Sequence, residues 1–98
     1  MEQSLSGEGI DRSATIVNRR GLHARAASRF VQTASEFDAE VSVTKGGQTV
    51  SGSSIMGLMM LAAGPGTEIH IHAEGPQAVQ AVEAICAIIA AKFGEEEG

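Results

Sequence analysis

A histidine within a cluster of arginines is the feature of this chain best suited to chemistry. Four of its seven basic residues, Arg19, Arg20, Arg25 and Arg29, surround His23 within eleven positions. A neutral imidazole is a nucleophile at ordinary cellular pH, because it titrates near pH ~6.5. A neighbouring guanidinium can hold the oxygens of a group bound to it. This combination suits a histidine that takes up a phosphoryl group and hands it on, with Arg25 holding the oxygens of that group. The alternative is that His23 only caps a helix or lies on the surface.

The elements around His23 favour the same chemistry. Residues 13–17 are rich in β-branched side chains and predict a strand, and from His23 onward the apolar spacing becomes helical. The first N–H groups of a helix are unpaired and carry partial positive charge, so a helix start attracts anions. The expected apolar stripe of this helix consists of Ala27, Phe30, Val31 and Ala34.

The middle of the chain predicts a hairpin followed by a short helix. Residues 41–44 and 49–51 alternate as strands around a turn at 45–48. Ser54 is the expected N-cap of a helix over residues 55–63.

The last third predicts one more strand and one more helix. Residues 67–73 alternate, with Ile69 and Ile71 on the buried face and Glu68, His70 and His72 on the wet face. A final helix opens at residues 75–76, and its expected stripe is Val79, Val82, Cys86, Ile89 and Phe93.

This order predicts an α+β fold, an open-faced two-layer sandwich. A four-stranded antiparallel sheet is covered on one face by three helices in the order β-α-β-β-α-β-α. We divide the chain into a disordered N-terminal extension (1–10), one domain (11–93) and an acidic tail (94–98).

The short helix over residues 55–63 is apolar on all sides. One side can face the core, for which we expect Leu58, Leu61 and Ala62. The side left exposed would then carry Ile55, Met56 and Met59, and an apolar patch with adaptable methionines is typical of a protein-binding surface. The alternative is that these side chains pack under a loop.

Composition excludes several classes of function. The net charge of −5 argues against a nucleic-acid binder. Residues 12–35 and 41–67 nevertheless contain no carboxylate, which suits an anionic group or an acidic partner.

The single cysteine, Cys86, is interpreted as a small buried hydrophobe. His70 and His72 lack a third ligand, so we expect neither a metal nor a cofactor. Without a signal-like or membrane-spanning run, the protein is expected to be cytoplasmic, without membrane insertion.

Two motifs give the chain a family resemblance. Gly21-Leu22-His23-Ala24-Arg25 and Ser54-Ile55-Met56-Gly57-Leu58-Met59, in this element order, resemble HPr, the histidine-containing phosphocarrier of the bacterial phosphoenolpyruvate-dependent phosphotransferase system. The likeness covers residues 11–93. It implies a relay rather than an enzyme, with a phosphoryl group received on Nδ1 of His23 from phospho-enzyme I, next to Arg25. That group would pass to a histidine of an enzyme IIA, and HPr kinase/phosphorylase would act on Ser54.

The chain departs from the family pattern at two positions. Ala26 stands where most members have proline. Alanine at this position should loosen the turn without removing a chemical group. Ser53 stands where the family more often has lysine or another polar residue, so the regulatory phosphoacceptor is slightly ambiguous, with Ser54 preferred.

Two alternatives remain open. Within the family, the protein could serve the nitrogen-related regulatory branch instead of sugar transport. From another class, it could be a small α+β ligand-binding or interaction module in which His23 is structural. We expect a monomer in either case.

Overall fold

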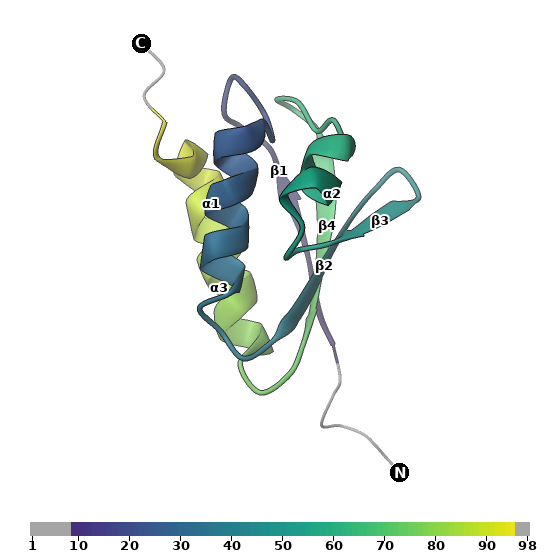
Figure 1. Ribbon diagram of the computed structural model, residues 1–98, viewed down its shortest axis with the longest axis vertical. Coiled ribbons are helices and arrows are strands. Elements are labelled where there is room, and N and C mark those ends of the chain that lie inside the picture. The colour runs from purple at the N-terminus through teal and green to yellow at the C-terminus, as the bar shows by residue number, and fades with distance from the viewer. Residues whose placement is uncertain (1–8, 96–98) are drawn as a thin grey trace.

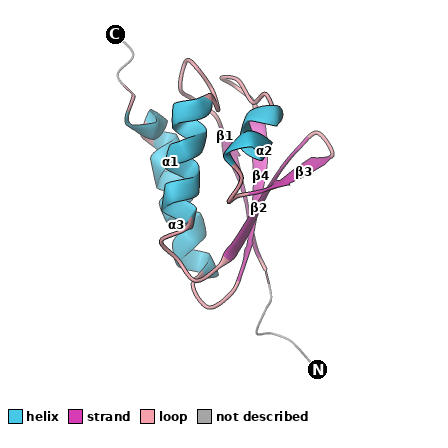
Figure 2. Cartoon of the chain, viewed as in Figure 1, coloured by secondary structure: helices cyan, strands magenta, loops and turns pink. Residues whose placement is uncertain are grey.

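The computed structural model describes residues 9–95 and shows an open-faced sandwich (Figures 1 and 2). Its elements are β1 (Ile10–Thr15), α1 (Ala24–Ala34), β2 (Glu40–Lys45), β3 (Gln48–Ser51), α2 (Ile55–Met60), β4 (Glu68–Glu74) and α3 (Ala78–Ala90). The antiparallel sheet has the strand order β1-β4-β2-β3, and the helices lie over one of its faces. This confirms the predicted fold class and element order.

The central strand β4 shows why one face of the sheet is covered. Ile69, Ile71 and Ala73 are buried beneath the helices, whereas Glu68 and His70 are exposed on the opposite face. Successive side chains of a strand point to opposite faces, so this alternation fixes which side packs. The core continues through the largest fully buried side chains, which include Ile16, Phe30, Val43, Leu58, Val82 and Ile85.

The hairpin forms as the sequence predicts. Gly46 and Gly47, with φ of 56° and 87°, make the two-residue connection between β2 and β3. Positive φ at both positions is what a tight hairpin turn requires. Nζ of Lys45 then donates a hydrogen bond of 3.0 Å to the carbonyl oxygen of Leu61, tying the hairpin to the end of α2.

Several element boundaries differ from those predicted, and two of the differences are described here. The first strand covers Ile10–Thr15 rather than residues 13–17, because its register against β4 begins with Ile10 opposite Ala73. The second helix ends at Met60 instead of residue 63. Ala62 has a φ of 53° and is exposed, so the prediction that it faces the core was wrong. Ala63 is buried in its place.

The predicted stripe of the last helix was also partly wrong. Val79 is 45% exposed and Cys86 is only partly buried, although Val82 and Ile89 are in the core as expected. The buried side of α3 is formed by Ala78, Ala81, Val82, Ile85 and Ile89. The helix is apolar on more than one side, so sequence spacing alone did not fix which side packs.

After α3 the chain makes a single turn, Lys92–Gly94, in which all three residues have positive φ. Phe93 is buried at 4% exposure, as predicted, but it packs from this turn rather than from the helix. Most of the expected N-terminal extension and acidic tail, residues 1–8 and 96–98, lies outside the described residues. Within residues 9–95, no helix has the length and apolar character needed to cross a bilayer.

Candidate functional site

His23 is the N-cap residue of α1. Its backbone is extended (φ −77°, ψ −179°), and its carbonyl oxygen accepts a hydrogen bond of 2.8 Å from the N–H of Ala27. The imidazole makes no capping hydrogen bond, so it is available for other contacts. The structure therefore places His23 at the start of a helix, as the sequence predicts.

The loop before His23 is held against the segment that follows α2. The N–H of Leu22 donates to the carbonyl oxygen of Ala63 at 3.0 Å. Gly21 has a φ of +67°, and a Cβ built on it would lie only 2.4 Å from the same carbonyl oxygen. Glycine is needed here on both counts, and the contact joins the His23 loop to the helix that carries the predicted binding patch.

Glu95 contacts His23 directly, and sequence reasoning missed it. Nε2 of His23 forms a hydrogen bond with Oε2 of Glu95. The two side chains are 19% and 12% exposed. Oε1 of Glu95 accepts a hydrogen bond of 3.0 Å from Nδ2 of Asn18, which also donates to the carbonyl oxygen of Gly21 at 2.9 Å. The fully buried Asn18 thus fixes the carboxylate that meets the imidazole.

The environment of Glu95 favours its charged form. Burial by itself raises the pKa of this carboxyl, but the hydrogen bonds from His23 and Asn18 and the nearby charge of Arg20 outweigh it. The net effect holds the pKa of Glu95 below its ordinary value. Glu95 is therefore a carboxylate at neutral pH.

Arg25 lies in the first turn of α1 with its side chain exposed. Within residues 9–95 no hydrogen bond or ion pair joins it to His23. The structure therefore places the two residues at the same helix start without a direct bond between their side chains. An exposed guanidinium in this turn remains available to an incoming anion.

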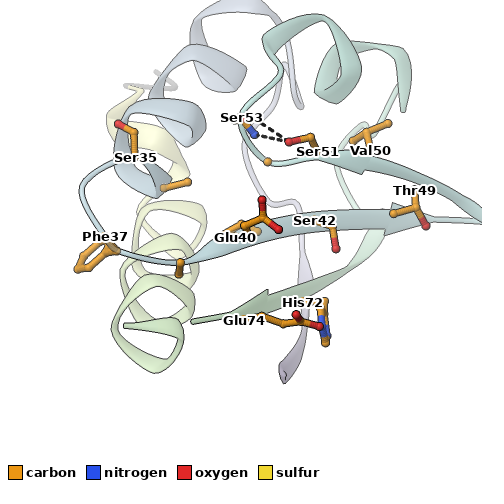
Figure 3. A pocket seen from close by; sticks show the side chains of 14 residues that line it. Ser35, Phe37, Glu40, Ser42, Thr49, Val50, Ser51, Ser53, His72 and Glu74 are labelled. Atoms are coloured by element: carbon orange, nitrogen blue, oxygen red, sulfur yellow. Dashed lines mark hydrogen bonds and ion pairs between the residues drawn. The ribbon is translucent and has the colours of Figure 1, made fainter. Parts of the chain in front are cut away.

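Ser54 caps α2, as predicted. Its Oγ accepts a hydrogen bond of 2.9 Å from the N–H of Gly57. Ser53 is exposed instead, and its Oγ lies 2.8 Å from Oγ of Ser51 (Figure 3). Ser53 lines a pocket between the end of α1 and strands β2 and β3, and His23 is not among the residues of that pocket. The two serines therefore differ in burial and in hydrogen bonding, which leaves the choice of phosphoacceptor open.

The apolar side chains predicted to be exposed on α2 are exposed. They are Ile55, Met56 and Met59, and Met60 joins them as a residue that the sequence interpretation did not include. We call these four residues the apolar patch. Leu58 and Leu61 are buried on the other side, as predicted.

His70 and His72 lie on the open face of the sheet, with carboxylates beside them. Oδ1 of Asp11 is 2.9 Å from Nε2 of His70 and 2.8 Å from Nδ1 of His72. Glu74 contacts Nε2 of His72 at 2.9 Å, and the hydrogen bonds with Glu74 and Asp11 raise the pKa of His72. Hydrogen bonds with His72 and then His70 lower the pKa of Asp11. Within residues 9–95, no group of three or more such side chains is arranged to hold a metal ion.

Comparison with known proteins identifies similar sequences over nearly the whole chain. The family model described as the PTS HPr component phosphorylation site matches residues 10–91. Phosphocarrier protein HPr of Neisseria meningitidis serogroup A is 49% identical over 88 residues, which are 90% of this chain and 99% of that protein. Phosphocarrier protein NPr of Shewanella violacea is 45% identical over 86 residues, which are 88% of this chain and 94% of that protein.

Solved structures agree with the sequence comparison. HPr from Thermoanaerobacter tengcongensis superposes with a TM-score of 0.85 at 41% identity, covering 90% of this chain and 99% of that one. A structure described as an HPr dimer from the same organism has a TM-score of 0.71 at 38% identity, covering 96% of this chain and 100% of that one.

Proposed function

Since the chain belongs to the HPr family of phosphocarrier proteins of the phosphotransferase system, we propose that His23 is its phosphoryl acceptor. In this proposal His23 receives the group from phospho-enzyme I and passes it to a histidine of an enzyme IIA. The observation that supports it most is the position of His23: a partly exposed imidazole at the N-terminus of α1, with no capping role.

The transfer needs a nucleophile and positive charge on the phosphoryl oxygens. A ring nitrogen of His23 attacks phosphorus, the phosphorus–nitrogen bond of the donor histidine breaks, and its electron pair stays on the donor nitrogen. The first N–H groups of α1 and the guanidinium of Arg25 are the candidates for holding the oxygens. The chain itself turns over no small molecule, so it acts as a relay rather than as an enzyme.

The apolar patch is the proposed docking surface for enzyme I and enzyme IIA. It belongs to α2, whose following segment accepts the hydrogen bond from Leu22 beside the acceptor loop. A partner seated on the patch would therefore lie close to that loop. The patch belongs to residues 41–67, a stretch of sequence without carboxylates, which suits partners with acidic surfaces.

Ser54 is the proposed site of regulation by HPr kinase/phosphorylase. A phosphate there would sit at the N-terminus of α2, where the free N–H groups favour negative charge. It would also lie beside Ile55 and Met56 of the apolar patch. We propose that the modification leaves α2 folded and weakens partner binding.

The decisive test is incubation with phosphoenolpyruvate and enzyme I. The parent protein should gain an acid-labile phosphoryl group, and His23→Ala should gain none while remaining folded. Arg25→Ala should be phosphorylated more slowly, because a charge-assisted hydrogen bond worth about 1.5–3 kcal/mol is lost. A parent protein that gains nothing would favour the interaction-module alternative with a structural His23.

The branch of the system and the assembly state need separate measurements. Relatives named HPr and NPr are both similar to this chain, so transfer from phosphorylated protein to a sugar-branch and a nitrogen-branch enzyme IIA should be compared. We propose a cytoplasmic monomer. Sedimentation at several protein concentrations tests the monomer, and a dimer would contradict it.

A further inference from the structure

The carboxylate of Glu95 is held against His23 by a second hydrogen bond, from Asn18. One carboxylate oxygen meets Nε2 of His23, and the other accepts the 3.0 Å hydrogen bond from Asn18. Asn18 is fully buried, and its Oδ1 has no hydrogen-bond partner among the described residues, so its side chain bonds through Nδ2 alone. The carboxylate therefore has a fixed orientation toward the imidazole.

The backbone conformation of the three residues before Glu95 places its side chain next to His23. Lys92 and Phe93 have φ of 59° and 55°, values that side-chain-bearing residues rarely adopt, and Gly94 continues at 75°. The N–H groups of Gly94 and Glu95 each donate a 3.0 Å hydrogen bond, to the carbonyls of Ala91 and Lys92. The buried ring of Phe93 anchors this turn. Unusual backbone persists where the surroundings enforce it, and it is concentrated at functional sites.

The ionisation of Glu95 decides which ring nitrogen of His23 carries the hydrogen. An ionised carboxylate can only accept hydrogen bonds. The hydrogen of their shared contact therefore belongs to Nε2 of His23, and the neutral imidazole keeps its lone pair at Nδ1. Within residues 9–95, this contact is the one side-chain hydrogen bond that His23 makes, so Nδ1 is left unengaged.

We propose that Glu95 is a positioning residue that prepares Nδ1 of His23 as the nucleophile. This inference rests on the proposed function, in which His23 is the acceptor. As the bond from Nδ1 to phosphorus forms, the donor's phosphorus–nitrogen bond breaks and its electron pair remains on the donor. The ring of His23 then carries a positive charge, with the hydrogen still on Nε2. Glu95 offsets that charge, and no proton has to leave during the transfer.

The tautomer of His23 is measured by ¹⁵N chemical shifts of Nδ1 and Nε2 in histidine-labelled, unphosphorylated protein, well above the ordinary imidazole titration near pH ~6.5. Loss of a signal set in His23→Ala assigns the resonances. We expect the Nε2–H form to dominate in the parent protein and to fall toward a mixture of both forms in Glu95→Ala. Glu95→Gln has one acceptor oxygen instead of two, so Nε2 of His23 and Nδ2 of Asn18 compete for it, and its Nε2–H fraction should lie between those of the parent and Glu95→Ala. Glu83→Gln, at an exposed position on α3, controls for the change in net charge.

Phosphorylation rates on the same variants test whether the contact with Glu95 matters for acceptance. We expect Glu95→Ala to slow acceptance by about 10-fold to 100-fold, the range known for losing the carboxylate partner of a metal-ligating histidine. Glu95→Gln should also be slowed, because it lacks the charge that offsets the phosphorylated ring, whereas Glu83→Gln should match the parent.

A variant in which Glu95, Glu96 and Glu97 are all replaced by alanine prevents a neighbouring carboxylate from substituting. If it keeps the parent's tautomer ratio and remains folded, the inference is overturned. If the parent gains no acid-labile phosphoryl group at all, the proposed function fails instead. The two failures are distinguishable because the tautomer is read without phosphorylation.

Discussion

Replacing Gly21 with alanine tests how firmly the loop before His23 is tied to the segment that follows α2. Gly21 has a φ of +67°, and an added Cβ would lie 2.4 Å from the carbonyl oxygen of Ala63 and 2.9 Å from Cα of Gly64. Left-handed backbone costs an alanine about 1–2 kcal/mol. The contacted atoms are backbone and cannot rotate away, so we expect a total destabilisation of about 2–4 kcal/mol.

Gly46 provides the matched control. Its φ is +56°, and an added Cβ would meet nothing within 4 Å. Gly46→Ala therefore carries the backbone cost alone, about 1–2 kcal/mol. The difference between the two variants measures the close approach of the loop to Ala63.

Urea unfolding of both variants gives the two free energies of unfolding. For a domain of this size each kcal/mol lowers Tm by about 4–8 °C, so thermal melts provide an independent estimate. We also expect Gly21→Ala to slow phosphorylation, because the displaced loop carries His23, whereas Gly46→Ala should not. If Gly21→Ala is no less stable than Gly46→Ala, the reasoning from the 2.4 Å approach is refuted.

Three further predictions concern other parts of the surface. Met56→Glu should weaken the binding of enzyme I while changing the free energy of unfolding by no more than about 0.5 kcal/mol, as expected of an exposed side chain; a large drop in Tm would instead mean that the patch is packed. Ser54→Asp should slow phosphorylation of His23 without loosening α2. The phosphorylation rate measures the first effect, and amide exchange over residues 55–60 measures the second; an unchanged rate would contradict the proposed regulation. Because the pKa of His72 is raised, its ion pairs add stability that is complete below its unfolded pKa of about 6.5 and is lost as pH rises through the folded pKa. Asp11→Asn should reduce this dependence in urea titrations across that range, and an unchanged dependence would contradict the assignment.

Local patterns predicted much of the fold, because local rules determine those parts. Alternation over residues 67–73 identified the buried Ile69 and Ile71 because side chains in a strand alternate strictly. Spacing failed in α3, where Val79 is exposed at 45%. Apolar residues occur on several sides of that helix, so packing on the rest of the domain, rather than periodicity, selected Ala78 and Ala81 for the core.

Some residues of the candidate site could be predicted from the sequence and others could not. His23 and Ser54 were identifiable because helix starts have local signatures, and the structure places both as N-cap residues. Asn18 and Glu95 were not, since their contact spans 77 positions and depends on a turn with positive φ at Lys92 and Phe93. No propensity rule predicts a left-handed conformation at two successive residues that are not glycine.

The Lys92–Gly94 turn also sets how often the side chain of His23 separates from that of Glu95. Regions of a protein open independently, with free energies between zero and that of global unfolding. Opening this turn breaks two backbone hydrogen bonds and exposes the ring of Phe93. The sheet and the helices α1, α2 and α3 can remain intact. Hydrogen exchange should therefore be faster at Gly94 and Glu95 than within α3. The fraction of molecules with an unpaired imidazole is then governed by a local equilibrium and can change without any change in the stability of the domain.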